Sequence, residues 1–220
     1  SVSEDVKRIF AEKSRMPIAE KTMVVPNGYD EEDFKLKDLP AESRKIITYT
    51  GTISEAYDVD KLLEALVRLD ERLKEQLLIR FVGKIPQAIE QRFRDTGLEI
   101  ELMGYVDHQK SIQYLLRSDL LLLVLPKVNN NKGILTGKFF EYLASQKPIL
   151  AIGPVDGDLA RIILDTNCGR IFDYSDTAGM IRYIQNIFDQ EITLVKPESA
   201  GSYSRRELTR RISGLFDAKT

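Results

Sequence analysis

The stretch LLLLVLPKVNNNKGILTGKFFEYL, residues 120–143, decides the fold. Its first six residues are all apolar, as expected of a strand that is buried on both faces of a parallel sheet. The residues from Lys138 onward have the pattern of a helix, and a strand that leads into a helix is the unit of an α/β fold. A plain connector needs far fewer residues than the polar stretch 126–137. We therefore expect this loop to hold a ligand.

Alternating strand-like and helix-like segments extend this unit along the chain. Apolar, β-branched runs predict six strands, and apolar stripes at helical spacing predict the helices between them. The predicted strands are 45–50, 77–83, 98–106, 119–126, 148–153 and 168–173. The predicted helices are 58–76, 86–97, 108–118, 138–145, 158–166 and 176–190. Strands joined by helices run parallel. The prediction is an α/β fold, a three-layer Rossmann-like domain with a six-stranded parallel sheet over residues 35–190.

The two ends of the chain depart from this alternation. Residues 1–34 contain a short amphipathic helix (SEDVKRIFAEKS), a strand-like TMVV and the turn PNG. Residues 191–204 are polar, and SRRELTRRISGLF (204–216) predicts a closing helix. We therefore expect an interdomain segment over 1–34, left from an N-terminal domain, and a connector with a crossing helix over 191–220. Because the chain starts with Ser1 rather than Met, we also expect a fragment of a longer protein.

Composition limits the classes of partner. The chain has 32 basic and 34 acidic residues, and this balance argues against a nucleic-acid surface. No apolar run approaches the roughly 20 residues needed to span a bilayer, and no signal peptide is recognised. The single cysteine, Cys168, excludes an internal disulfide and a thiolate metal cluster. We expect a cytoplasmic protein. The arginines of the last helix are compatible with peripheral contact with the inner face of a membrane. The preferred interpretation is that they face solvent or contact a missing domain.

The topology predicts where a ligand binds. In a doubly wound sheet of strand order 3-2-1-4-5-6, ligands lie between the loops after the first and fourth strands. Here those loops are residues 50–57 and 126–137, the longest and most polar at that edge. The free N–H groups of the helix near Thr136, Gly137 and Lys138 attract an anion such as a diphosphate.

Lys138 and Glu141 have two interpretations. Lys138 adds positive charge at the anion site, and Glu141, one turn later, is a suitable acceptor for two ribose hydroxyls. The plain alternative is a Lys–Glu pair on a helix surface. His108, the only histidine, either touches the ligand or is simply the first helical residue after an N-cap at Asp107.

Other candidate motifs are weaker. Asp58-Val59-Asp60 matches the Asp-x-Asp of metal-dependent sugar transferases, but two acids also favour a helix N-terminus, so we expect no metal. Gly51-Thr52-Ile53-Ser54 lacks the second glycine of a dinucleotide fingerprint, and no cofactor is expected. The four tyrosines near strand ends and helix faces suit core packing better than base stacking. They are Tyr49, Tyr57, Tyr105 and Tyr142.

Six segments in order suggest a known family. They are VVPNGYDEEDF (24–34), TGTISEAYDVDKLLEAL (50–66), FVGK (81–84), LMGYVDHQKSIQYLLRSDLLLLVLP (102–126), GKFFEYLASQKPILAIG (137–153) and DTNCGRIFDYSD (165–176). With these segments the chain resembles the C-terminal, donor-binding half of a retaining glycosyltransferase of the GT-B fold, family 4 type. The resemblance covers nearly the whole chain, and FEYLASQKPIL is its most specific part.

The resemblance implies a site for a nucleotide-activated sugar. It places the ribose on Glu141, and the base on the backbone at Tyr105 and Val106 near the loop of Gly83 and Lys84. The diphosphate and sugar are implied to face Gly51, Thr52, Ile134, Thr136, Gly137 and Lys138. It further implies an N-terminal domain of the same enzyme, a glycan or lipid-linked acceptor, and metal-independent, retaining hexosyl transfer. No catalytic residue is assigned, and the fragment alone is expected to bind nucleotide weakly and to transfer no sugar.

The chain departs from the family pattern in three places. Gly133 stands eight residues before Glu141, where the family often has a second glutamate that contacts the sugar. Thr52 stands where the family often has arginine, and Tyr57 or Asp58 where it often has lysine. The diphosphate charge then falls to Lys138, Lys132, the helix N-terminus or the partner domain. The alternatives are a non-catalytic nucleotide-sugar-binding module and a sugar-nucleotide epimerase of similar fold. A flavodoxin-like signalling domain is disfavoured, since the expected phosphoacceptor acid is missing.

Overall fold

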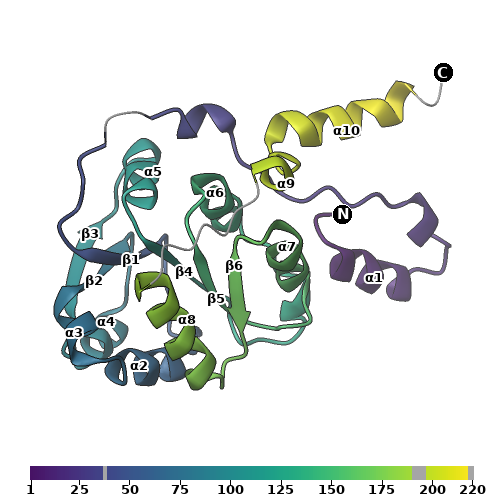
Figure 1. Ribbon diagram of the computed structural model, residues 1–220. Helices are drawn as coiled ribbons and strands as arrows, with labels where there is room; N and C mark the ends of the chain where they lie inside the picture. The colour runs from purple at the N-terminus through teal and green to yellow at the C-terminus, as the bar shows by residue number, and fades with distance from the viewer. Residues whose placement is uncertain (37–38, 190–196, 218–220) are drawn as a thin grey trace.

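The sheet has six parallel strands in the order β3-β2-β1-β4-β5-β6. The structure is a computed structural model that describes residues 1–36, 39–189 and 197–217 (Figure 1). The strands are β1 Lys45–Thr50, β2 Leu77–Val82, β3 Glu99–Gly104, β4 Leu120–Val124, β5 Ile149–Ile152 and β6 Gly169–Phe172. The predicted α/β class, the parallel sheet and the strand order are confirmed.

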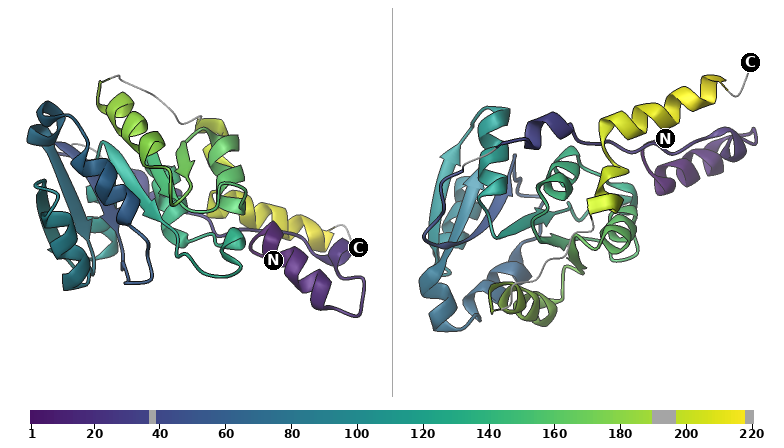
Figure 2. Two further views of the ribbon diagram at one scale, coloured as in Figure 1. Left: turned by 90° about the horizontal axis from the view of Figure 1, so that it is seen from below. Right: turned by 45° about the horizontal axis from the view of Figure 1, so that its top comes forward.

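Helices cover both faces of this sheet, which makes three layers (Figures 1 and 2). One face packs against α2 Asp60–Val67, α3 Glu71–Gln76, α4 Gln87–Arg94 and α8 Thr177–Asp189. The other packs against α5 His108–Leu116, α6 Gly137–Ser145, α7 Asp158–Thr166 and α9 Pro197–Gly201. Three short 3-10 helices are η1 Ala19–Lys21, η2 Glu31–Phe34 and η3 Asn131–Gly133.

Strand β4 is buried on both faces, as its apolar run predicts. Leu120, Leu122 and Val124 belong to the core under α2 and α8, and the alternate residues Leu121 and Leu123 to the core under α5, α6 and α7. Each of these side chains is at most 2% exposed. Burying such a side chain contributes about 2 kcal/mol, so β4 anchors both layers.

The predicted single helix over 58–76 is wrong. The chain forms α2 and α3 there, separated by residues 68–70. The carboxylate of Asp70 accepts a hydrogen bond from the Leu73 amide at 2.9 Å and begins a new helix, because an N-cap residue satisfies an otherwise unpaired N–H group.

Both ends of the chain leave the three layers on the same side of the domain. Helices α1 (Glu4–Lys13) and α10 (Arg205–Asp217) project there, as Figures 1 and 2 show. The two ends meet at an isolated parallel bridge between Tyr29 and Ser204, where the Arg205 amide donates to the Tyr29 carbonyl at 2.8 Å. TMVV, predicted to be strand-like, joins no strand of the described sheet.

The predicted connector over 191–204 contains the short helix α9, and residues 191–196 lie outside the described part. Ala200 of α9 is only 3% exposed and packs in the same core as Tyr29, whose hydroxyl donates to the Ala200 carbonyl at 3.4 Å. Within residues 1–36, 39–189 and 197–217, no helix combines the length and apolar character that a membrane span requires.

Candidate functional site

The loops after β1 and β2 touch backbone to backbone. Gly51 has a φ of +92° and donates its amide to the Val82 carbonyl at 2.8 Å. Gly83 has a φ of +132°, and a Cβ there would lie 2.3 Å from the Gly51 carbonyl oxygen. The Ile53 amide also donates to the Lys84 carbonyl at 3.0 Å. The two predicted glycine loops therefore form one surface at the carboxyl end of the sheet, and Gly83 tolerates no side chain.

Lys138 joins the first helix turn of α6 to the loop after β1. Its Nζ donates to the Tyr49 hydroxyl at 2.8 Å and lies 4.2 Å from the centre of the Tyr49 ring. A Cβ on Gly51 would be 3.0 Å from the same Nζ atom. The loops after the first and fourth strands thus meet, as the topology predicts. Burial lowers the pKa of Lys138 to about 8, and the charge of Glu141 opposes this shift.

Two buried tyrosines hold this junction in place. The Tyr142 hydroxyl accepts hydrogen bonds from the Thr50 amide at 2.8 Å and from the Thr50 hydroxyl at 3.2 Å. The Tyr49 hydroxyl donates to the Thr52 carbonyl at 2.9 Å. Burial raises the pKa of both phenols, that of Tyr142 to about 12. Both side chains belong to the core, as the packing interpretation predicts, and their hydroxyls fix the end of β1.

The N-terminus of α6 carries no side-chain cap. Thr136 is the N-cap residue, but its side chain makes no capping bond, and its buried hydroxyl oxygen has no hydrogen-bond partner. In α5, by contrast, the predicted N-cap Asp107 accepts from the Lys110 amide at 2.8 Å. A Cβ on Gly137 would meet nothing within 4 Å, so no other group crowds this first residue of α6 on its Cβ side. Such an end attracts an anion.

Glu141 lies one turn further along α6, beside His108. The Nδ1 atom of His108 is 4.0 Å from Glu141 Oε1, and its Nε2 atom is 2.9 Å from Asp33 Oδ2. Burial raises the pKa of Glu141, and the nearby His108 opposes that shift. Asp33 is a site residue that sequence reasoning missed. It lies 75 residues from His108, and no local pattern marks it.

The remaining predicted residues differ in their exposure. Thr52 and Lys84 are exposed, Val106 is half-buried, and the Tyr105 side chain is 87% exposed beside the start of α5. The side chain of Ile134, by contrast, packs against the core under α6. Its amide donates to the Asn131 carbonyl at 3.2 Å, so neither group is directed to a ligand.

The asparagines of the loop over 126–137 shape the loop itself. Asn130 has a φ of +61°, a left-handed conformation that asparagine tolerates. Asn131 Nδ2 donates to the Pro126 carbonyl at 3.0 Å and to the Tyr174 hydroxyl at 3.1 Å. Lys132 pairs with Asp156 at 2.5 Å. Lys132, named as a candidate for the diphosphate charge, is thus engaged by a carboxylate after β5.

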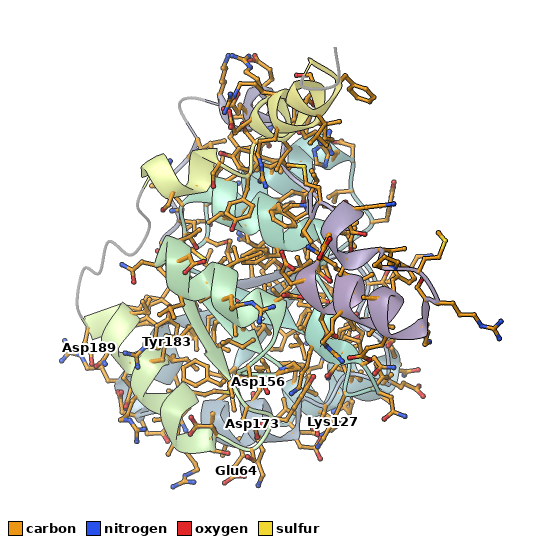
Figure 3. All side chains as sticks on the ribbon, turned by 90° about the vertical axis from the view of Figure 1, so that its right-hand side faces the viewer. Glu64, Lys127, Asp156, Asp173, Tyr183 and Asp189 are labelled. Atoms are coloured by element: carbon orange, nitrogen blue, oxygen red, sulfur yellow. The ribbon has the colours of Figure 1, made fainter. Side chains whose placement is uncertain are left out.

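Figure 3 shows Lys127, Asp156 and Asp173, which follow β4, β5 and β6, at the foot of that view. Hydrogen bonds from Ser175 lower the pKa of Asp173, and the charge of Lys127 adds to this shift. Lys127 also pairs with Asp58 at 3.1 Å, and Asp60 pairs with Arg92. In the part of the chain that the structure describes, no three ligating side chains gather as a metal site. Asp60 lies in the first turn of α2, and its amide donates to Asp58 Oδ1 at 3.3 Å.

Gly133 packs against the first turn of α1. A Cβ there would lie 3.1 Å from the Ser3 hydroxyl and 3.1 Å from Asp5 Cβ. The Asp5 amide donates to the buried Asp158 carboxylate at 2.9 Å, which fixes α1 at this place. A glutamate side chain at position 133 would require α1 to move.

One family model matches most of the chain. The family described as "Glycosyl transferases group 1" matches residues 30–207. Similar solved structures include WaaG, a glycosyltransferase involved in lipopolysaccharide biosynthesis (TM-score 0.70, 16% identity). Others are sucrose-phosphate synthase from Thermosynechococcus elongatus (0.75, 18%) and HepE from Anabaena in complex with UDP and glucose (0.73, 17%). A search of the curated proteins found no match.

These structural matches cover 94%, 99% and 99% of this chain but only 57%, 57% and 62% of the three solved chains. The chain thus spans less than two thirds of the length of these structures. At such identities the likeness shows the fold alone.

Proposed function

The chain belongs to the family of group 1 glycosyl transferases, and from that premise we propose that it is the domain that binds a sugar-nucleotide donor. The observation that carries the proposal is the junction of Gly51, Lys138 and the uncapped start of α6, with Glu141 one turn away. HepE, a relative in fold, was crystallised with UDP and glucose, which supports a nucleotide of this class.

Each part of a nucleotide diphosphate has a matching group in this proposal. The diphosphate lies at the first amides of α6 and near Lys138 Nζ, where positive potential is exposed. Glu141 accepts the ribose hydroxyls, and the base lies by Tyr105, Val106 and the loop of Gly83. Gly51 and Gly83 have no side chains of their own, which lets the diphosphate approach their backbone closely, and Lys138 Nζ lies beside Gly51.

The full enzyme would transfer a hexose from this donor to a glycan or lipid-linked acceptor. In the proposal it is a family 4, GT-B enzyme that retains anomeric configuration, and this chain is its C-terminal half. Helices α1 and α10, at the two ends of the chain, would contact the N-terminal domain that binds the acceptor. Charge that develops on the departing diphosphate would be stabilised by the α6 amides and the Lys138 ammonium, a role that requires no metal ion.

Calorimetric titration of the 220-residue chain with UDP, GDP and ADP tests the site. Lys138→Met and Glu141→Gln should each weaken binding by about tenfold or more, because each removes a charged hydrogen-bonding group. Lys147→Met is the matched control, since it removes a lysine just before β5, at the amino end of the sheet. Equal affinity of all three variants would exclude the assigned site. Sugar transfer by the isolated chain would exclude the proposed need for a second domain.

One observation favours a second candidate, a non-catalytic nucleotide-sugar-binding module. Gly133 is covered by Ser3 and Asp5 of the chain's first segment, so the place of a sugar-contacting glutamate is closed by α1. A full-length protein that binds a nucleotide sugar but neither transfers nor hydrolyses it would favour this candidate. Turnover of the donor would exclude it.

A further inference from the structure

His108 lies between two carboxylates from separate parts of the chain. Asp33 comes from η2, His108 begins α5, and Glu141 lies in α6. An ionised carboxylate accepts hydrogen bonds and cannot donate one, so the Nε2 atom, 2.9 Å from Asp33, carries a hydrogen. This bond orients the ring and leaves Nδ1 directed toward Glu141.

We propose that His108 is a positioning residue for Glu141, and that Asp33 holds the imidazole ring for this task. The inference rests on the proposed function, in which Glu141 accepts hydrogen bonds from both ribose hydroxyls. Two donors require an ionised carboxylate with both oxygens free to accept. His108 Nδ1, 4.0 Å from Oε1, lies beside the carboxylate without occupying it, which limits the side chain's rotamers, and the proximity of His108 favours the ionised form of Glu141.

Among the charged neighbours of Glu141, His108 has the largest effect on its pKa. Burial raises the pKa of this carboxyl, and four charged neighbours act on it. The positive groups that oppose the shift are His108, Arg205 of α10 and Lys138 of α6, in decreasing order of effect, while Asp33 adds to the shift. Lys138 is itself bonded to Tyr49. His108 is therefore the neighbour that most favours the ionised carboxylate.

Access is compatible with this role. The side chain of Glu141 is 30% exposed and that of His108 is 52% exposed, so a ribose can reach the carboxylate beside the ring. Sharing the ring between Asp33 and Glu141 also links η2, in the segment before β1, to the ligand site. A buried, purely structural histidine would show neither this exposure nor a second carboxylate.

The test compares two probes, UDP and 2′,3′-dideoxy-UDP, which lacks both ribose hydroxyls. Calorimetry on the 220-residue chain measures both affinities for the wild type, His108→Ala, Glu141→Gln and the double variant. Glu141→Gln should weaken UDP binding by about tenfold or more. His108→Ala should weaken it by about three- to fivefold, as for a half-exposed charge pair. Neither variant should change the affinity for the dideoxy probe.

The matched control is Gln109→Ala, an exposed neighbour in the same helix turn. In the double variant, His108→Ala should add no loss beyond that of Glu141→Gln, because it acts only through the carboxylate. Equal losses for both probes, or additive losses in the double variant, would overturn the role of His108 while leaving the donor site in place. If Glu141→Gln has no effect or UDP does not bind, the proposed function fails, and the inference fails with it.

Discussion

Replacing Lys138 with methionine should stabilise the fold and weaken nucleotide binding at the same time. Burial lowers the pKa of the ammonium from its ordinary value of 10.5 to about 8. One pKa unit corresponds to about 1.4 kcal/mol, so a charged Lys138 costs the folded chain up to roughly 3 kcal/mol at neutral pH. Methionine keeps the length and the apolar packing of the side chain without the charge.

Two contacts of the ammonium offset part of that cost. Nζ lies 4.2 Å from the centre of the Tyr49 ring and donates to its hydroxyl at 2.8 Å. A cation–π contact contributes about 0.5–2 kcal/mol and a hydrogen bond about 1 kcal/mol. We therefore expect Lys138→Met to be more stable by about 1 kcal/mol at pH 7, which raises Tm by about 2–4 °C for a chain of this size.

The stability difference should depend on pH in one direction. The folded-state pKa of Lys138, about 8, lies below the unfolded-state value of about 10.5. Between these values the unfolded chain holds more protons, so wild-type stability relative to Lys138→Met rises as the pH rises through 8. The advantage of the variant should be full below about pH 7. Because the penalty on the wild type falls by about 2 kcal/mol between pH 7 and pH 9.5, the advantage should be lost between these values and reversed by about pH 9.5.

Urea denaturation of both chains across that range measures the difference, with Lys147→Met as the control lysine. Calorimetry at pH 7 should show UDP affinity lower by about tenfold or more, because a charge-assisted bond to the diphosphate is lost. A variant that is less stable than the wild type at pH 7, or a difference that stays constant with pH, would refute the reasoning. Unchanged UDP affinity would remove Lys138 from the site.

Three further predictions test the framework by urea denaturation. Gly83→Ala should lower the free energy of unfolding by on the order of 3 kcal/mol, because its Cβ would lie 2.3 Å from the Gly51 carbonyl. Gly137→Ala, whose Cβ meets nothing within 4 Å, should change it by less than about 1 kcal/mol. Equal urea midpoints for the two variants would contradict this. Tyr142→Phe should cost about 1–3 kcal/mol, because the buried Thr50 amide loses its acceptor, and an unchanged midpoint would show that another group accepts it. Asp70→Ala should lower the free energy of unfolding by about 1 kcal/mol, because α3 loses its cap. Asp70→Asn still caps the helix and should retain most of that stability.

Strand β4 illustrates why the sheet could be predicted from sequence. Its five residues belong to the apolar run 120–125, which predicts burial on both faces and so a place in the interior of a parallel sheet. Strand order then follows from the doubly wound topology, and the order determines which loops meet. These inferences depend on local pattern and on chain connectivity, and both are present in a single sequence.

The break between α2 and α3 shows where local pattern fails. Leu69 and Leu73 continue the apolar stripe of the first helix, and both side chains are buried in the same core. Periodicity therefore predicts one helix. The cap at Asp70 depends on a single hydrogen bond from the Leu73 amide. In the sequence, an aspartate within an apolar helical stripe is only a weak signal of such a cap.

Contacts between distant segments account for the site residues that sequence reasoning missed. Asp33 reaches His108 across 75 residues, and Gly133 packs against Ser3 and Asp5 at the start of the chain. Neither contact follows from the sheet topology, because segments 1–34 lie outside the strand–helix alternation. Their placement depends on tertiary packing alone.

The pKa values of Lys138 and Glu141 shift in the opposite directions to those of a simple surface ion pair. A Lys–Glu pair on a helix surface would raise the pKa of the lysine and lower that of the glutamate. Burial instead lowers the pKa of Lys138 and raises that of Glu141, so each charge is held where the folded chain disfavours it. Lys138 is bonded to Tyr49, and His108 Nδ1 lies 4.0 Å from Glu141 Oε1. Charges that are buried in this way reduce the stability of the folded chain unless a ligand compensates them. In the proposed complex, a diphosphate beside the Lys138 ammonium and ribose hydroxyls on the Glu141 carboxylate would compensate both charges.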